Sequence, residues 1–256
     1  MNIFVTNDDG VDAPGIRVLA AALHAAGHDV LVVAPADDRS GSGAAIGKLY
    51  RDRPLPVTDH TWEDLPGIVV RSIDAPPATA VLAACLGAFG DVPDLVVAGI
   101  NPGANTGHLV IPAGPVGAAL PAAGLDVPAI AVSTRWSTTN EYHWETAAAF
   151  AVAAVEWVVQ PDVAPRVVNI NVPNLPLDEV LGVQETELAP HGEVWIASAD
   201  ASSGDLKLDV KGRADAAPGT DVAAVASGYV SVTPLRSVVR AASTGAADAV
   251  SAALPD

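Results

Sequence analysis

Apolar and polar positions alternate in long blocks along the first two thirds of the chain. Residues 3–5 are continuously apolar, residues 16–26 repeat apolar side chains at helical spacing, and residues 29–35 form a second apolar run. A strand without polar gaps is typical of a parallel sheet that is covered on both faces. Strand, helix and strand at this length predict a βαβ unit.

The same alternation continues to residue 173. We predict further strands and helices at 49–57, 67–72, 75–87, 94–98, 114–124, 127–132, 140–159 and 167–173, the helices being 75–87, 114–124 and 140–159. Because proline removes a backbone N–H, we expect Pro121 to kink or end its helix.

The pattern changes after residue 175. Short β-like pieces alternate with Gly, Asp and Ser turns, which predicts a β-hairpin extension with exposed edges that can serve oligomerisation. A short helix at 221–227, capped by Thr220 or Asp221, precedes a returning strand at 229–235 and an alanine-rich tail. We therefore predict an α/β fold, with residues 1–175 as the core and residues 176–256 as the extension.

Composition narrows the class of protein. Of the 256 residues, 50% are hydrophobic and 17% are charged, as in globular chains. The net charge of −17 argues against binding to nucleic-acid duplexes, which requires clustered lysine and arginine. No apolar run reaches the roughly 18 residues of a membrane span. No leader pattern precedes the first strand. We therefore expect a cytoplasmic protein without membrane contacts.

Cysteine, histidine and tryptophan indicate no separate site. Cys85 is the only cysteine, and its apolar neighbours favour a buried structural thiol over a nucleophile. The six histidines show no close metal-ligand spacing. Packing is favoured over stacking on a ligand for most of the tryptophans Trp62, Trp136, Trp144 and Trp195.

Polar residues gather where the first predicted strand ends. That strand runs into Asn7, Asp8 and Asp9, and open α/β sheets bind ligands beyond the carboxyl ends of their strands. Two adjacent carboxylates repel each other and are costly to bury unpaired, so one interpretation is a site for a hard cation such as Mg²⁺. The other is an Asp-rich turn that caps the next helix.

Two more polar loops follow neighbouring strands. Residues 36–44 carry Ser40, Gly41 and Ser42, whose hydroxyl and N–H groups can bind an anion or add an oxygen ligand to a metal. A plain Ser/Gly linker is the alternative, although the position beside the aspartates favours function. Asn101 follows a later strand, and its amide carbonyl can bind a hard metal or belong to an ordinary Asn-Pro turn.

Together these loops resemble the SurE (survival protein E) family of nucleotide phosphatases. The resemblance rests on residues 5–15, 33–35, 39–43, 98–107, 128–133, 169–173 and 228–235, which occur in the family's order. It implies a Rossmann-like three-layer fold and hydrolysis of nucleoside 5′- or 3′-monophosphates. It also implies one divalent ion per subunit, Mg²⁺ or Mn²⁺, and a homodimer or homotetramer built by exchange of the late hairpin.

The resemblance assigns roles to single residues as well. The implied metal ligands are two carboxylates, one hydroxyl and one amide: Asp8, Asp9, Ser40 and Asn101. Asp8 and Asp9 are the catalytic candidates, and Asp8 would orient or deprotonate the attacking water. Contacts to the phosphate are assigned to Asn7, Ser40, Gly41, Ser42, Asn101, Gly103, Asn105 and Gly114.

One loop departs from the family pattern. Where the family usually has Ser-Gly-Thr, this chain has Ala113-Gly114-Pro115, so two hydroxyls and one backbone N–H are lost. Each charge-assisted hydrogen bond is worth about 1.5–3 kcal/mol. Two alternatives follow: a phosphohydrolase for another nucleotide-like or secondary-metabolite phosphate, or a metal-binding paralogue with impaired catalysis. A haloacid-dehalogenase-type phosphatase is disfavoured, because Asp8-Asp9 lacks the Asp-x-Asp spacing.

Overall fold

Strand β1 (Asn2–Thr6) lies near the middle of the sheet around which the fold is built. The computed structural model describes residues 1–47, 54–160, 167–202, 204–212 and 216–236. Across these residues the main sheet contains, in spatial order, β3 (Val57–His60), β4 (Val69–Ile73), β2 (Asp29–Pro35), β1, β5 (Leu95–Pro102), β6 (Ala129–Thr134), β7 (Val167–Val172), β11 (Val230–Leu235) and β8 (Val183–Glu185). The strands from β4 to β7 are parallel, whereas β3 and β11 run antiparallel to them.

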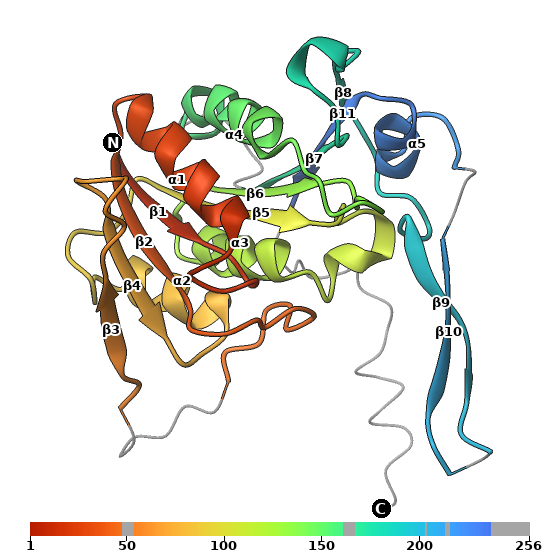
Figure 1. The fold of residues 1–256 in the computed structure, drawn as a ribbon, viewed down its shortest axis with the longest axis horizontal. Coiled ribbons are helices and arrows are strands. Elements are labelled where there is room, and N and C mark those ends of the chain that lie inside the picture. The colour runs from red at the N-terminus through yellow and green to blue at the C-terminus, as the bar shows by residue number, and fades with distance from the viewer. Residues whose placement is uncertain (48–53, 161–166, 203, 213–215, 237–256) are drawn as a thin grey trace, which may run out of the picture.

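Helices cover both faces of this sheet (Figure 1). Helices α1 (Pro14–Ala25) and α4 (Trp144–Val158) pack on one face, and α2 (Pro77–Cys85) and α3 (Gly114–Gly124) pack on the other. In β1, Ile3 and Val5 join the core beneath α1 and α4, whereas Phe4 joins the opposite core. All three side chains are at most 1% exposed. The predicted mostly parallel, doubly covered sheet is confirmed.

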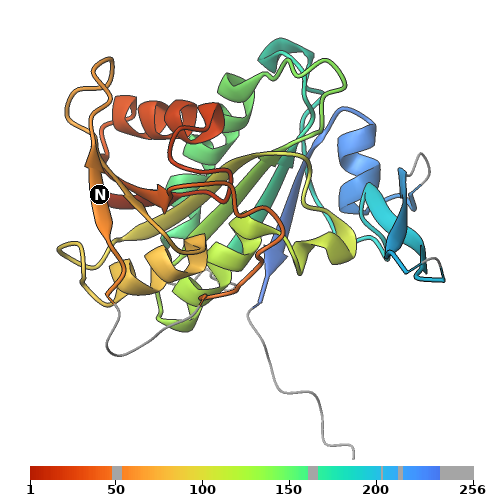
Figure 2. The same cartoon turned by 60° about the horizontal axis from the view of Figure 1, so that its bottom comes forward.

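The C-terminal part forms the predicted hairpin. Strands β9 (Val194–Asp200) and β10 (Lys207–Gly212) pair antiparallel and project from the body (Figures 1 and 2). Helix α5 (Asp221–Ala226) packs on β11, and two short 3₁₀ turns, η1 (Gly107–Val110) and η2 (Leu177–Glu179), complete the described elements. None of the described helices is long and apolar enough to cross a membrane.

Two predicted boundaries near prolines were wrong. The strand predicted at 49–57 begins only at Val57; residues 54–56 form no strand because Pro54 and Pro56 cannot donate to a ladder, and residues 49–53 lie outside the described residues. Pro121 does not end α3, which continues to Gly124. A proline this close to a helix end forfeits a single backbone hydrogen bond of the last turns. The alanine-rich tail also lies outside the described residues.

Two other boundaries differ for local reasons. The last long helix begins at Trp144 instead of residue 140, because Asn140 adopts a left-handed backbone with φ of +59°. Strand β5 extends to Pro102, so Asn101 lies inside a strand that was predicted to end at residue 98. An irregularity after Ala98 shifts the pairing with β6 and sets Asn101 opposite Ser133.

Cys85 has the predicted structural role. The thiol is free, its residue is 8% exposed, and it belongs to the core between α2 and the sheet. Burial raises the pKa of the Cys85 thiol to about 11. The neutral form therefore dominates near neutral pH, which excludes a reactive thiolate.

The buried carboxylate of Asp221 joins the extension to the core. Asp221 is 0% exposed and accepts hydrogen bonds from the backbone N–H groups of Gly107 (2.7 Å) and Ala189 (2.9 Å). Gly107 ends the loop that follows β5, whereas Ala189 follows β8. One side chain at the start of α5 thus fixes a loop of the parallel core.

We predict that Asp221→Asn destabilises the protein by roughly 2–4 kcal/mol, because an amide cannot accept from both N–H groups without exposing its own NH₂ to one of them. The free energy of unfolding from urea denaturation measures the change. Asp178→Asn, at an exposed position on η2, is the matched control and should change stability by less than about 0.5 kcal/mol. Equal stability of the two variants would contradict the assignment.

Candidate active site

The candidate site lies at the edge of the sheet where β1 and β5 end. Strand β1 pairs with β2 on one side and with β5 on the other, so the strand order reverses between β1 and β5. Ligands of open α/β sheets bind at such a reversal, beyond the carboxyl ends of the strands. Asp8 and Asp9 follow β1 directly, and Asn101 lies near the end of β5.

A cavity of about 540 Å³ opens at this edge. Seven of the predicted site residues line it: Asp8, Asp9, Ser40, Gly41, Asn101, Asn105 and Gly114. The lining residues that were not predicted as site residues are Asp38, Pro102, Leu109, Pro112, Ala113 and Trp136. The cavity therefore collects residues from the loops after β1, β2 and β5 and from the start of α3.

Asp8 and Asp9 bring buried charge to the cavity. Asp8 is 2% exposed, and Oδ1 of Asp8 and Oδ2 of Asp9 are buried without a hydrogen-bond partner. Burial, aided by the charge of Asp38, raises the pKa of Asp8 to about 6. Burial, together with the charges of Asp8 and Asp38, raises the pKa of Asp9 to about 7.

These raised pKa values carry a cost in stability. In the unfolded chain both carboxyls ionise near pH 3.8, whereas in the folded chain they hold their protons to about pH 6 and 7. The metal-free protein therefore loses stability as the pH rises from about 3.8 to about 7. A bound cation would offset the repulsion between the two ionised groups.

The start of α3 is built against Asp8. A Cβ atom at Gly114 would overlap the carboxylate of Asp8, so only glycine fits there. The backbone N–H of Gly114 lowers the pKa of Asp8 against the larger effect of burial. Gly114 therefore determines how closely a helix N-terminus approaches the buried acid.

The loop after β2 is fixed by backbone contacts to its neighbours. The Arg39 N–H donates to the backbone oxygen of Asp8 (2.7 Å), and the Gly43 N–H donates to that of Pro112 (3.0 Å). Ser40 donates from its N–H and its hydroxyl to Oδ1 of Asp38 (2.7 and 2.6 Å). The hydroxyl oxygen of Ser40 keeps its lone pairs for a ligand.

Asn101 has its amide nitrogen occupied. Nδ2 donates to the backbone oxygen of Gly103 (2.7 Å), so the side-chain carbonyl is the atom that remains for a cation. Gly103 itself donates its N–H to the backbone oxygen of Thr134 (2.8 Å). Hydrogen bonds thus fix the side chain of Asn101 against Gly103, and fix Gly103 against the end of β6.

The donor set fits a hard divalent metal ion. Its members are two carboxylates with unpartnered buried oxygens, one hydroxyl and one amide carbonyl. Oxygen ligands of this kind suit Mg²⁺ or Mn²⁺. No group of three or more His, Cys, Asp or Glu residues able to hold a metal occurs in the described part of the chain. Such an ion therefore depends on the neutral oxygens as well as on the two acids.

Asn105 is held by a buried polar network. The backbone N–H of Asn105 donates to Oδ1 of Asn171 (2.7 Å), and the backbone carbonyl of Asn105 accepts from Nδ2 of Asn169 (2.8 Å). The side-chain Nδ2 of Asn105 donates to the hydroxyl of Ser133 (2.7 Å). Sequence reasoning counted Asn169 and Asn171 as strand residues and as part of the family resemblance, but gave them no role at the site. The available signal was two asparagines in an otherwise apolar strand, where a buried amide requires partners.

Three predicted residues do not line the cavity. Asn7 is fully buried and donates from Nδ2 to the backbone oxygen of Gly10 (2.9 Å). Ser42 lies deeper in its loop, and its hydroxyl is buried without a partner. Gly103 accepts the amide of Asn101. In this structure, these three residues support the loops whose neighbours line the cavity.

Asp38 is the residue of the β2 loop that sequence reasoning missed. It lines the cavity, holds Ser40 and raises the pKa values of both aspartates by its charge. The signal was present, since Asp38 follows the end of a buried strand just as Asp8 does.

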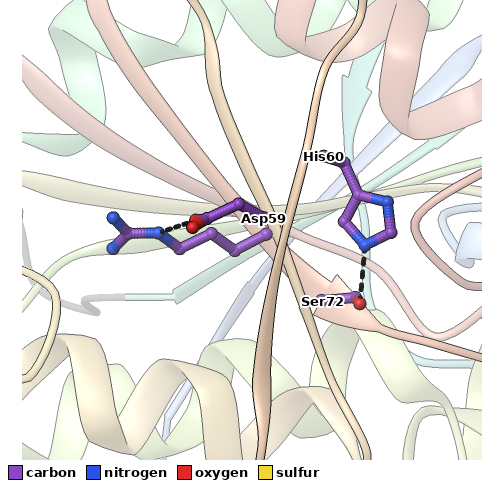
Figure 3. Close-up of polar contacts among 4 residues, drawn as sticks. Asp59, His60 and Ser72 are labelled. Carbon is purple, nitrogen blue, oxygen red and sulfur yellow. Dashed lines mark hydrogen bonds and ion pairs between the residues drawn. The ribbon is translucent and has the colours of Figure 1, made fainter.

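A serine–histidine pair elsewhere in the sheet does not form a hydrolytic triad (Figure 3). His60 Nε2 and Ser72 Oγ lie 2.7 Å apart on the neighbouring strands β3 and β4. Asp59 points to the opposite side of β3, where its carboxylate binds Arg71 (2.9 Å). Asp59 therefore cannot orient His60, as the acid of a triad must.

Comparison with known proteins identifies the family. The family model described as Survival protein SurE matches residues 3–193. The 5′-nucleotidase SurE of Stenotrophomonas maltophilia (strain K279a) is 41% identical over 92% of this chain and 90% of its own length. The 5′-nucleotidase SurE of Xanthomonas campestris pv. campestris (strain B100) is 38% identical over 92% and 89%.

A solved structure supports the same assignment. The SurE protein from Aquifex aeolicus superimposes with a TM-score of 0.74 at 30% sequence identity, and the match covers 94% of this chain and 95% of that one. The curated relatives and the solved structure match nearly the whole length of the chain, and the family model matches residues 3–193. The chain belongs to the SurE family.

Proposed function

We propose that this protein is a metal-dependent phosphomonoesterase that hydrolyses nucleoside 5′- or 3′-monophosphates to nucleoside and phosphate. The observation that carries the proposal is the pair of unpartnered carboxylate oxygens on Asp8 and Asp9, which line one cavity with Ser40 and Asn101. The relatives named 5′-nucleotidase SurE support the substrate class. A divalent cation, Mg²⁺ or Mn²⁺, is the cofactor that these oxygens suit.

In the proposed reaction, Asp8, Asp9, Ser40 and Asn101 would hold the ion, and the residues that line the cavity around it would hold the substrate. When bound, a divalent ion polarises a phosphoryl oxygen and lowers the pKa of bound water. Asp8 orients or deprotonates the water that attacks phosphorus. The phosphorus–oxygen ester bond then breaks, and the nucleoside leaves with a proton on its oxygen. Gly41 and Gly114 line the cavity and would lie beside the phosphate.

The start of α3 favours a second candidate function. Ala113 lines the cavity where the family has a hydroxyl, and Pro115 brings no N–H to the first turn of the helix. Fewer donors weaken the hold on a phosphate dianion. The second candidate is therefore a phosphohydrolase of the same mechanism that prefers another nucleotide-like or secondary-metabolite phosphate and binds it through contacts beyond the phosphate.

The hairpin supports a proposal that the protein is a homodimer or homotetramer. Val194, Ile196, Leu208 and Val210 on β9 and β10 are 41–60% exposed. Val210 pairs with Ile196 across the two strands of the projecting hairpin, so these two apolar side chains are neighbours. Such a surface is stabilised by burial against a second copy of the chain.

Phosphate release from a panel of nucleotides tests the first proposal. We expect activity with Mn²⁺ or Mg²⁺, loss of activity in EDTA, and a reduction of kcat by at least about 100-fold in Asp8→Asn. Asp12→Asn is the matched control, because Asp12 is exposed and does not line the cavity. Activity that survives EDTA, or equal effects of the two substitutions, would refute metal dependence through Asp8.

Restoring the family loop tests the second candidate. The double variant Ala113→Ser, Pro115→Thr should raise kcat/KM for mononucleotides about 10-fold or more, because each regained hydrogen bond to a charged group is worth about 1.5–3 kcal/mol. Ala44→Ser adds a hydroxyl at an exposed position of the loop after β2, outside the cavity lining, and serves as control. A wild-type preference for some other phosphate that the double variant loses would favour the second candidate.

Light scattering of the purified protein tests the oligomer. The double variant Ile196→Glu, Val210→Glu should reduce the measured mass to that of one chain, because two buried charges cost more than the interface gains. Leu86→Glu, at a 74% exposed position after α2, should keep the wild-type mass. A wild-type protein that is already monomeric would contradict the proposal.

A further inference from the structure

An aromatic cavity of about 350 Å³ adjoins the candidate metal site. Asp9, Pro102 and Trp136 line both cavities, so the two spaces share a wall. The aromatic part of the lining consists of Trp136, Tyr142 and Trp144. Its volume lies within the range of small-molecule sites, about 300–1,000 Å³. A ligand held at Asp9 therefore has an aromatic compartment next to it.

Trp136 presents an exposed ring from a fixed backbone. The side chain is 59% exposed, although the neighbouring Ser137 is only 8% exposed. The preceding residue, Arg135, donates its N–H to the backbone oxygen of Val172 (2.9 Å) and pairs through its guanidinium with Glu193. A backbone that is fixed beside Trp136 before the ligand arrives lowers the conformational entropy lost on binding.

The other wall of the cavity is fixed as well. The rings of Tyr142 and Trp144 stack with centroids 4.6 Å apart and an interplanar angle of 27°. Between them, the His143 N–H donates to Oδ1 of Asn174 (2.8 Å), and Nδ2 of Asn174 donates to the backbone oxygen of Glu141 (2.8 Å). Asn174 thus clamps the segment that carries both rings.

Trp62 is a tryptophan that packs inside the protein, and it contrasts with Trp136. Trp62 is 6% exposed, and the guanidinium of Arg17 lies over its ring, 4.7 Å from the centroid. Trp62 is thus buried within the protein, with Arg17 against one face of its ring. Trp136 differs because most of its ring is exposed beside the candidate site, so the expectation that tryptophans serve packing does not extend to it.

The chemistry of the cavity selects its occupant. Among the described residues, its lining contains no lysine or arginine, so it does not offer a second phosphate a counter-charge. It offers aromatic faces and the amide of Asn140. Flat heteroaromatic rings stack on such faces, and an amide can hydrogen-bond their edges.

We propose that this cavity binds the nucleobase of the substrate, with Trp136 as the stacking platform, while the phosphate lies at Asp8 and Asp9. The inference rests on the proposed function, because it takes the ligand at the metal site to be a nucleotide. Trp136 then determines specificity: it favours phosphates that carry an aromatic base over sugar phosphates that lack one.

Steady-state kinetics with substrates that carry a nucleobase and with substrates that lack one test the stacking role of Trp136. With Mn²⁺ present, Trp136→Ala should raise the KM for AMP about 5- to 100-fold, as expected for the loss of one stacking contact. The same substitution should raise the KM for ribose 5-phosphate less than about threefold, because this substrate has no base to stack. Trp136→Phe should keep most of the affinity for AMP. Trp157→Ala, a 42% exposed tryptophan near the far end of α4, is the matched control and should leave both KM values as in the wild type.

A binding measurement separates this inference from the proposed function. Calorimetry with adenosine, which has no phosphate, should give a Kd in the wild-type protein with Mg²⁺ and a Kd at least about fivefold weaker in Trp136→Ala. Adenosine binding through Trp136 without any phosphate release would uphold the base site and overturn the phosphatase proposal. Equal losses for AMP and ribose 5-phosphate, or no difference in adenosine binding between the proteins, would overturn the base site.

Discussion

Two adjacent carboxylates at the end of the central strand, Asp8 buried and Asp9 half-buried, are the constraint on which the rest of the site depends. Asp8 and Asp9 each keep a buried oxygen without a hydrogen-bond partner, and burial raises both pKa values. Such a pair is costly for an empty protein and suited to a cation. Glycine at 114, which lets a helix N-terminus touch Asp8, follows from that constraint.

The sequence predicted the ends of β1 and β2 well because the apolar runs break abruptly there. The run that ends before Asn7 is a buried strand in the centre of the sheet, and the loop with Ser40 follows the strand beside it. Parallel strands bring their carboxyl ends to one edge, so polar residues distant in sequence could be predicted to meet. Seven of the predicted site residues indeed line one cavity.

The other features of the site depend on contacts between distant parts of the chain, which no local sequence pattern predicts. Asn101 lies inside β5 because the pairing with β6 shifts after Ala98, and register is a property of two strands. Asp38 faces the aspartates only because its loop is bonded to the backbone of Asp8. Trp136 is exposed at the cavity beside Arg135, whose N–H is bonded to β7, and residue type alone favoured packing for it.

The central claim is that Asp8 and Asp9 remain buried and unpaired in order to hold a divalent cation. Anomalous diffraction from crystals soaked in Mn²⁺ tests it most directly. We predict one manganese peak per chain within bonding distance of both carboxylates, about 2.0–2.3 Å, with Ser40 and Asn101 beside it. A peak elsewhere in the molecule with this cavity empty, or no peak at millimolar Mn²⁺, would contradict the account.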